Sequence, residues 1–475
     1  MHRNESYRAA ILLGIFIGLS LTTNAFAQAP AAAPPTGAQA QRGPGCMTCH
    51  GDGVSGEALR VAEEQYHKSS HWLGFRTQAA PGSADTVEFR DVTNEATQDS
   101  IPSHPESMGC MGCHTEQGFR QRLAEGKSNG LTPVANPLHI ECFTCHQPHT
   151  NGNFNLVTTA PVTSLTKTAG VAGRTFDGGK GNLCAMCHRL TLSEPDGFHK
   201  PWDGKAKDET VTESVNQFGH QPHEADFLLG QGEWPFDSNY DGTGKPLPYH
   251  TENPHYSAVK DTCVGCHMNP RGQTSGMAGH TFFLTNYRQD VTSECVGCHG
   301  ADAFRPQPRQ AGTGGPAGPG GPGGGGMHFR DAKIDTADKL VDYDGDGTAS
   351  QLLVEIEGMR NTLVNYFLAP ANFPKPGSAT PVAPLRKLLH PDPPGTLHPE
   401  LLTSYNLYVD YRTNTMGSIA FSPSQAESFF NLRMILFDGS FGIHNPRFAA
   451  QVLYDSIKNL NVNAHAGLKI GLTRP

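Results

Sequence analysis

The sequence predicts a protein built mainly from irregular loops and short α-helices with little β-structure, followed by an α-helical C-terminal domain. Three observations lead to this prediction. Hydrophobic residues make up only 37% of the 475 residues, and 54 Gly and 36 Pro interrupt regular elements. All 12 Cys lie before residue 300, and the Cys-free remainder shows helical periodicity. A chain so poor in apolar residues needs something besides its own side chains to fill its interior.

The first 27 residues have the pattern of a secretory signal peptide. Arg3 and Arg8 give a basic start, residues 9–21 form an apolar run, and residues 25–27 (Ala-Phe-Ala) form a small-residue cleavage site. An uncleaved anchor is the alternative, although the run is short for a bilayer span. We therefore expect an exported protein, periplasmic or at the outer surface, with no transmembrane segment in the mature chain.

Every cysteine belongs to one of six Cys-x-x-Cys-His units. In each unit the two thiols can form thioether bonds to the vinyl groups of a haem, and the adjacent His can bind its iron as the proximal ligand. Neither a zinc ribbon nor a disulfide framework requires a His after the second Cys, yet all six units have one. We therefore predict loops and short helices wrapped around six c-type haems. The covalent sites are Cys46, Cys49, Cys110, Cys113, Cys142, Cys145, Cys184, Cys187, Cys263, Cys266, Cys295 and Cys298, and the proximal ligands are His50, His114, His146, His188, His267 and His299.

The spacing of the units predicts that the haems lie close together. The distance from Cys110 to Cys142 is 32 residues, and the distance from Cys263 to Cys295 is again 32 residues. Two closely spaced haem pairs are therefore expected, with the sites at Cys46 and Cys184 between or beside them. Six macrocycles within the stretch from Cys46 to His299 would supply much of the missing apolar core.

Histidines are also the best candidates for the sixth iron ligands. The sequence holds 23 His, and this abundance favours His over Met, which lowers the reduction potential of a haem. Eleven histidines outside the motifs compete for six places: His67, His71, His104, His139, His149, His199, His220, His223, His250, His255 and His280.

Several short motifs narrow this choice. The stretch from Cys142 to His149 (Cys-Phe-Thr-Cys-His-Gln-Pro-His) resembles the Cys-x-x-Cys-His-x-Pro-His signature of multihaem c-type cytochromes with paired haem motifs. The resemblance covers about residues 46–300 and implies that the trailing His binds a neighbouring haem. Similar elements surround five more histidines, so the distal ligands implied are His71, His149, His220, His223, His255 and His280. His104 and His139 are the reserves, and the assignment of ligands to irons stays open.

Composition divides the chain into five parts. A signal peptide (1–27) and a flexible lead-in rich in Ala and Pro (28–45) precede the haem-binding domain (46–304). Residues 305–326 are a Gly/Pro-rich linker that cannot bury apolar surface. Residues 327–475 are expected to form a haem-free helical domain.

Three helices are expected in this C-terminal part. One falls within 349–369, where five apolar residues recur at helical spacing: Leu352, Ile356, Met359, Leu363 and Phe367. A second should run from Pro423 to Asp438. The third should begin with Asn445 as N-cap and Pro446 in the first turn and continue to about residue 460. His444, just before it, is interpreted as a capping or packing residue.

An acidic segment before the first of these helices resembles the start of a calcium loop. Its candidate ligands lie at alternate positions: Asp342, Asp344, Asp346 and Thr348. The twelfth position, where an EF-hand has Glu, is Leu353, so that Glu355 or Glu357 would have to substitute. A calcium site and a solvated acidic turn both stay open.

The sequence favours an electron-transfer relay through bis-His haems, in respiratory or extracellular electron transfer, over an enzyme. Its partners would be a redox protein donor and acceptor, and the net charge of −9 argues against nucleic acid. One alternative is a multihaem reductase with one open iron that acts on a small nitrogen or sulfur compound. Another is a filament-forming conductive cytochrome that self-associates.

Overall fold

The computed structural model describes part of the chain. The described residues are 57–67, 69, 71, 112–113, 115–126, 131–132, 140–147, 155–163, 173–189, 205–206, 211–213, 223–236, 249–269, 278–284, 293–300, 340–369, 372 and 419–475. The predicted signal peptide, the first haem motif at Cys46 and the Gly/Pro-rich linker lie outside them.

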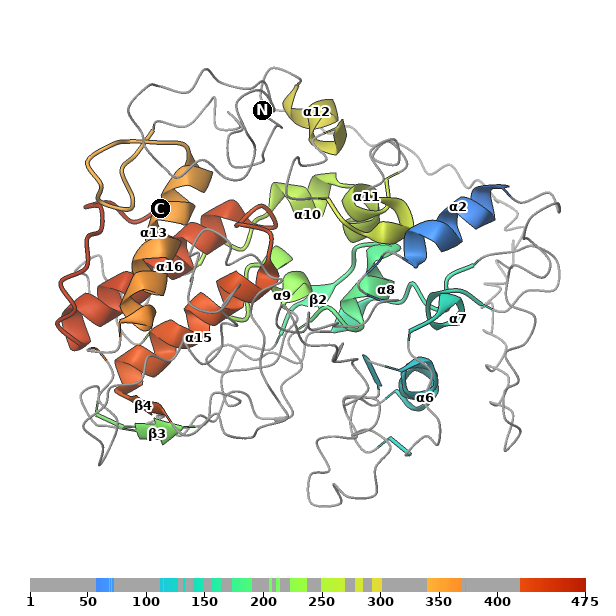
Figure 1. The fold of residues 1–475 in the computed structure, drawn as a ribbon, viewed down its shortest axis with the longest axis horizontal. Helices are drawn as coiled ribbons and strands as arrows, with labels where there is room; N and C mark the ends of the chain where they lie inside the picture. The colour runs from blue at the N-terminus through green and yellow to red at the C-terminus, as the bar shows by residue number, and fades with distance from the viewer. Residues whose placement is uncertain are drawn as a thin grey trace, which may run out of the picture. The chain divides into compact units, whose positions relative to one another are not determined.

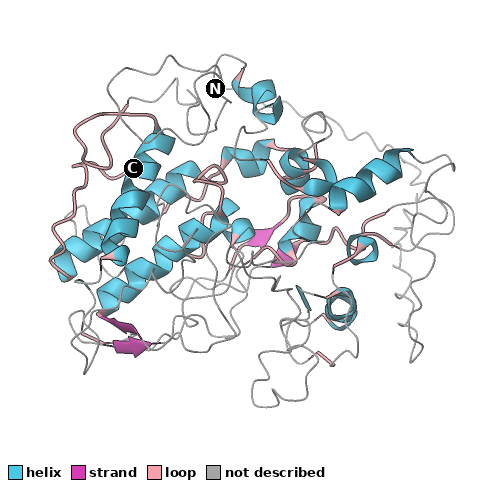
Figure 2. Ribbon diagram, in the orientation of Figure 1, coloured by secondary structure: helices cyan, strands magenta, loops and turns pink. Residues whose placement is uncertain are grey.

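The described residues are mostly helix and loop with little strand, as predicted (Figures 1 and 2). The elements before residue 300 are short. The α-helices described in this part of the chain are α2 (Glu57–Tyr66), α6 (Glu116–Glu125), α7 (Cys142–Cys145), α8 (Gly181–Ala185), α9 (Glu224–Leu228), α10 (Pro254–Ala258), α11 (Cys263–His267) and α12 (Ser293–His299). Residues Gly279–Thr281 form the 3-10 helix η3.

The described residues contain two small antiparallel sheets. β1 (Val162–Thr163) pairs with β2 (Thr175–Phe176), with Val162 opposite Phe176. β3 (Val211–Glu213) pairs with β4 (Ile419–Phe421), so that the segment before the fifth motif is joined to the C-terminal part.

The C-terminal helices begin and end almost where the sequence predicts. They are α13 (Leu352–Leu368), α15 (Pro423–Asp438) and α16 (Pro446–Asn463), the last about one turn longer than expected. The predicted terminal signals are confirmed. Asn445 caps α16 by accepting a hydrogen bond from Phe448 N, and Gly439 ends α15 in the left-handed conformation with φ 62°.

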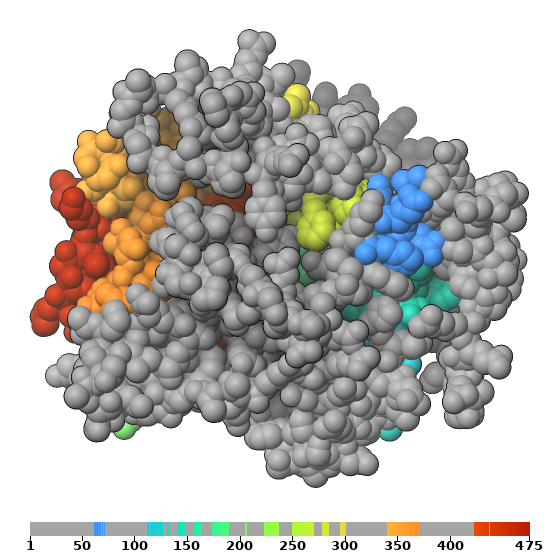
Figure 3. Space-filling model, in the orientation of Figure 1, coloured from blue at the N-terminus to red at the C-terminus, as the bar shows by residue number. Residues whose placement is uncertain are grey.

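The main hydrophobic core joins these helices to a segment from the haem-motif region. The predicted stripe on α13 is confirmed, since Ile356, Met359, Leu363 and Phe367 are all buried. The same core contains Phe227, Trp234 and Phe236. In the space-filling view the surface of residues 340–369 (orange) lies beside that of the C-terminal segment (red), in line with a hydrogen bond from Gly471 N to Tyr343 O (Figure 3).

Specific polar contacts fix that junction. The Trp234 backbone N donates to Asn431 Oδ1 at 2.6 Å, and Asn431 Nδ2 donates back to Trp234 O at 3.2 Å. The Phe227 ring packs edge-on against Phe448 with ring centres 5.2 Å apart. The C-terminal helices therefore pack directly on residues that neighbour the haem motifs. None of the described helices combines the length and the apolar character that a membrane span requires.

Candidate haem sites

Most of the described motifs lie on single helical turns. α7 holds Cys142 and Cys145, α11 spans Cys263–His267, and the last motif ends α12. Residues at positions i, i+3 and i+4 share one face of a helix. The two thiols and the imidazole of such a motif are thus presented to the same side, as attachment to one porphyrin requires. The nine described cysteines form no disulfide among themselves.

The fourth motif lies between two others. The Cys187 thiol is within hydrogen-bonding reach of Cys113 in the second motif, and Cys184 is within reach of Cys263 in the fifth. This position agrees with the expectation that the site at Cys184 lies between or beside the two haem pairs. Because these thiols of different motifs lie within reach of one another, we expect the groups that they would carry to be close neighbours.

A tight backbone contact holds the fourth and fifth motifs together. Thr262, which precedes α11, donates from Oγ1 to Gly178 O at 3.1 Å. A Cβ atom at Gly181, the first residue of α8, would lie 2.0 Å from that same Oγ1. Only glycine lets the two helical turns approach so closely.

Each described motif His faces a second histidine from outside the motifs. The ring centres are 6.3 Å apart for His146 and His280, 5.9 Å for His188 and His71, and 6.0 Å for His299 and His255. The fourth pair is His267 and His444, at 6.2 Å.

These separations match an iron bound from both sides. Two imidazoles on one metal have ring centres about 6 Å apart, because each metal–nitrogen bond is about 2 Å and each nitrogen lies about 1 Å from its ring centre. Ordinary aromatic pairs also fall in the range of about 4.5–7 Å. The distinguishing feature is that all four described motif histidines pair with a non-motif histidine.

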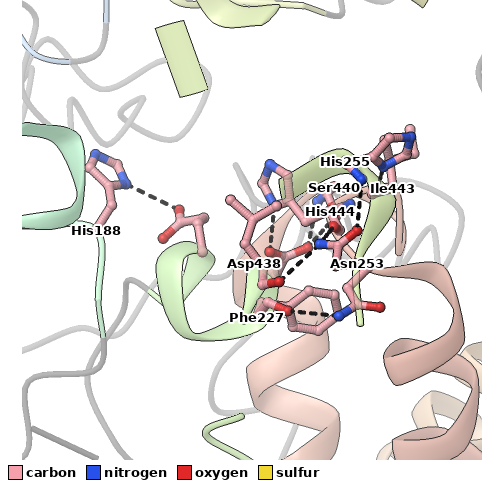
Figure 4. A network of polar contacts seen from close by, with 11 residues as sticks. His188, Phe227, Asn253, His255, Asp438, Ser440, Ile443 and His444 are labelled. Atoms are coloured by element: carbon pink, nitrogen blue, oxygen red, sulfur yellow. Dashed lines mark hydrogen bonds and ion pairs between the residues drawn. The ribbon is translucent and has the colours of Figure 1, made fainter. Parts of the chain in front are cut away.

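Hydrogen bonds orient several of these rings through Nδ1. His267 Nδ1 lies 2.8 Å from Phe282 O, and His255 Nδ1 lies 2.7 Å from Ile443 O. Carboxylates hold the other two, with His188 Nδ1 3.3 Å from Glu224 Oε1 and His444 Nδ1 2.6 Å from Asp438 Oδ1 (Figure 4). A metal-binding imidazole generally donates its second N–H in this way, which leaves Nε2 for the metal.

The protonation of the rings follows their surroundings. Burial lowers the pKa of His71 and of His267 to about 4, so both imidazoles are neutral at pH 7. Burial acts in the same direction on His188 and His444, but the adjacent carboxylates of Glu224 and Asp438 outweigh it and raise the pKa of each histidine to about 9. Glu224 and Asp438 are therefore the carboxylate partners of His188 and His444, whereas His255 and His267 lie beside the neutral carbonyl oxygens of Ile443 and Phe282.

Two buried arginines point to an anionic group that the polypeptide does not provide. Arg122 is 3% exposed and Arg189 is 7% exposed. Arg122 Nη1 donates to Cys113 Sγ at 3.0 Å, but Arg122 Nη2 and Arg189 Nε have no hydrogen-bond partner among the described residues. Arg189 Nη1 does donate to Thr163 O at 2.7 Å, but a buried guanidinium N–H that makes no hydrogen bond is costly. The propionates of a haem lie at the porphyrin edge opposite its thioether bonds, so a propionate of a neighbouring haem would be the group to satisfy these nitrogens. The residues present fit closely packed haems.

The remaining candidates divide into two groups. His71 takes part in a ring pair, whereas its competitor His67 is partly exposed and lies 3.9 Å from Glu63. His223 is buried and occupies the N-cap position of α9, without a side-chain capping hydrogen bond. The other candidate site residues lie outside the described residues: Cys46, Cys49, His50, Cys110, His114, His149 and His220.

The structure adds a contact to the interpretation of His444. It precedes the N-cap of α16, as the sequence indicates, and its ring lies 6.2 Å from the ring of His267 in the fifth motif. No helical or strand periodicity of hydrophobic residues near His444 predicts this contact. The only local indication is a His that immediately precedes Asn-Pro and follows a glycine-containing turn.

The acidic segment folds around a carboxylate from α13. Asp342, Asp344 and Glu355 each offer an oxygen within 4.8 Å of the others. Glu355 therefore supplies the carboxylate that Leu353, at the twelfth position of the loop, cannot supply. Glu355 is 1% exposed and accepts hydrogen bonds from the backbone N of Tyr343, at 2.8 Å. Asp346 and Thr348 are exposed and do not join this group of carboxylates.

Comparisons with known proteins add little to the site. No protein-family model matches the chain, and no curated protein matches it. Among solved structures the chain is similar to an undecahaem cytochrome from the S-layer of Carboxydothermus ferrireducens, with 14% sequence identity and a TM-score of 0.33. The match covers 81% of this chain and 42% of that chain. A likeness at 14% identity and a TM-score of 0.33 does not identify the function of this chain.

Proposed function

We propose that the protein is an exported hexahaem c-type cytochrome that passes electrons through closely packed bis-His haems. The observation that carries this proposal is the pairing of motif histidines with histidines outside the motifs. The sequence singles out His71, His255 and His280 as sixth ligands, and each of their rings lies opposite a different motif His. The motif pattern alone does not require this arrangement.

The pairs supply an assignment of ligands to irons. His146 and His280 would hold the third haem, His188 and His71 the fourth, and His299 and His255 the sixth. The candidates for the first two haems, His149, His220 and His223, keep the status of predictions. Contacts between thiols of the second, fourth and fifth motifs support a continuous path for electrons.

The same pairing favours an electron carrier over a reductase. A reductase of small nitrogen or sulfur compounds needs an iron with an open coordination position. Each of the four motif histidines that the structure describes has a second ring at a distance suited to occupying that position. We therefore propose a redox protein as donor and another as acceptor. Periplasmic and outer-surface locations are both consistent with this role.

Carbon monoxide binding tests the proposal. The holoprotein is reduced with dithionite, exposed to carbon monoxide and followed in the Soret band. We expect no shift, because all six irons carry two protein ligands. A shift equal to one haem in the unaltered protein would instead support the reductase.

Two variants of neighbouring histidines calibrate the measurement. His71→Gly removes the ring that faces His188 and should make one haem reactive with carbon monoxide. His67→Gly removes a partly exposed histidine four residues earlier and should leave all six unreactive. Equal responses from the two variants would contradict the ligand assignment.

We propose calcium as a second, structural ligand, held by Asp342, Asp344 and Glu355. Burial raises the pKa of Glu355 and of Asp344, and a divalent cation would offset the cost of bringing these carboxylates together. Calcium titration followed by calorimetry should give one site in the unaltered protein and none in Glu355→Gln. Glu357→Gln, which changes a partly exposed glutamate on the same helix, is the matched control. No heat from the unaltered protein would leave the segment as an acidic turn.

A further inference from the structure

The C-terminal helices end next to the fifth haem motif, and His444 lies at the point of contact. Its ring centre is 6.2 Å from that of His267. The three other described motif histidines already face His71, His280 and His255. Among the described residues, His444 is therefore the histidine that matches His267.

We propose that His444 supplies the sixth ligand of the iron whose proximal ligand is His267, so that the C-terminal helices complete a haem site. This inference rests on the proposed haem-binding function. It differs from the ligand set that the sequence implies, because His444 joins the six distal candidates. One of His149, His220 and His223 then binds no iron.

Both rings are held with Nδ1 turned away from the shared space. Phe282 O accepts from His267, and Asp438 accepts from His444. The Asp438 side chain is fully buried, and it also accepts a hydrogen bond from the Ser440 backbone N at 3.3 Å. The His444 backbone N in turn donates to Ser440 Oγ at 3.1 Å. These contacts hold the ring in one orientation with Nδ1–H directed at Asp438, which leaves Nε2 as the nitrogen available to a metal.

The loop between α15 and α16 is built to deliver this side chain. α15 ends at Asp438, and Gly439 and Gly442 both have positive φ, 62° and 90°. A Cβ atom on Gly442 would come within 3.0 Å of Ile356 on α13. The turn is therefore tight against the helical core, and it places His444 immediately before the N-cap of α16.

The same loop docks on the haem-motif region through three hydrogen bonds (Figure 4). Asn253 Nδ2 donates to His444 O at 2.6 Å, and Asn445 Nδ2 donates to Phe227 O at 3.4 Å. Ile443 O accepts from His255 Nδ1 at 2.7 Å. Since His255 faces His299, adjacent residues of one loop serve two different haems. Ile443 orients one sixth ligand, and His444 is another.

The test compares His444→Gly with His465→Gly in the full-length holoprotein. His465 is an exposed histidine just after α16, so it controls for the loss of a C-terminal imidazole. Covalent haem is counted by mass spectrometry, and spin state is followed by the Soret band and by electron paramagnetic resonance. We expect His444→Gly to keep all its covalent haem and to convert one of six haems to a high-spin form that binds carbon monoxide. Free imidazole should return that haem to low spin, and His465→Gly should remain fully low-spin.

The outcomes separate this inference from the proposed function. If the unaltered protein carries no covalent haem, the proposed function fails. If it carries six low-spin haems and His444→Gly does too, the assignment of His444 is overturned while the cytochrome proposal stands. Should His444→Gly not fold, His444→Met decides. A methionine–iron absorption band from one haem supports the assignment, and an unchanged bis-His spectrum overturns it.

Discussion

The Nδ1 atom of His444 lies 2.6 Å from Oδ1 of Asp438, whose side chain is fully buried. The negative carboxylate would strengthen the donor character of a histidine bound to iron and favour the ferric state. Among the described rings, His255 and His267 donate to backbone carbonyls, which are neutral, and His188 lies beside the carboxylate of Glu224. The haem of the fifth motif should therefore have one of the lower reduction potentials.

Asp438→Asn tests this electrostatic role. The amide keeps the shape of the side chain and removes its charge, so the potential of one haem should rise. A change of about 1.5–3 kcal/mol, typical of a hydrogen bond to a charged group, corresponds to roughly 65–130 mV for one electron. A spectroelectrochemical titration measures the shift. This shift in potential should be absent when Asp438→Asn is combined with His444→Gly. Glu252→Gln, which removes one negative charge from an exposed site, should change the reduction potential of no haem.

Arg122→Gln should have the opposite effect on a different haem. Arg122 is buried beside Cys113, and loss of its positive charge would favour ferric iron. We expect an unchanged haem count and a fall in one potential of roughly 65–130 mV, again for about 1.5–3 kcal/mol. Arg447→Gln changes an exposed arginine on α16 and is the control. Identical titrations of the two variants would argue against a propionate at Arg122.

Sequence patterns predicted the local features of the fold well. α15 and α16 begin and end at residues whose capping chemistry is readable from neighbours in the chain, such as Ser422 and Asn445. His71, His255 and His280 could be named as candidate ligands because each sits in a short local motif, and their binding to iron stays a prediction. These features depend on side chains a few residues apart, where helical geometry and capping decide the outcome.

Contacts between distant residues were not predictable in the same way. His267 and His444 come together only because the C-terminal helices pack on Phe227 and Trp234, and no periodicity reports that docking. The choice between Glu355 and Glu357 likewise depended on which face of α13 turns to the acidic segment. The buried Glu355 faces it, whereas Glu357 is partly exposed.

Gly358 on α13 gives a test of how the acidic segment packs. A Cβ atom there would lie 1.7 Å from Asp344 Oδ2, which is itself held by a hydrogen bond from Asp346 N to Oδ1. In an unobstructed helix, Gly→Ala would stabilise by about 1 kcal/mol. Here we expect Gly358→Ala to lower the free energy of unfolding by about 1–3 kcal/mol. Asp344→Ala should restore most of the loss in the double variant, and additive effects would show that the two residues do not collide.

Glu233 should make the stability of the protein depend on pH. Burial, reinforced by Asp226, raises its pKa from 4.5 to about 8. The folded state therefore binds more protons than the unfolded state between these values, and stability should fall as pH rises from about 4.5 to 8, by up to about 1.4 kcal/mol per pH unit. Thermal unfolding measured across this range should show a shallower slope in Glu233→Gln than in Glu252→Gln. If the two variants showed equal dependence of stability on pH, the ionisation of Glu233 would not reduce the stability of the folded protein.

The number of covalently attached haems tests the central claim most directly. The protein is produced in a host that attaches haem c, and its intact mass is compared with the pyridine haemochrome absorbance per polypeptide. We expect six haem masses on a chain that has lost residues 1–27, and an absorbance that also corresponds to six. A mass equal to the bare polypeptide, with no haemochrome band, would contradict the account.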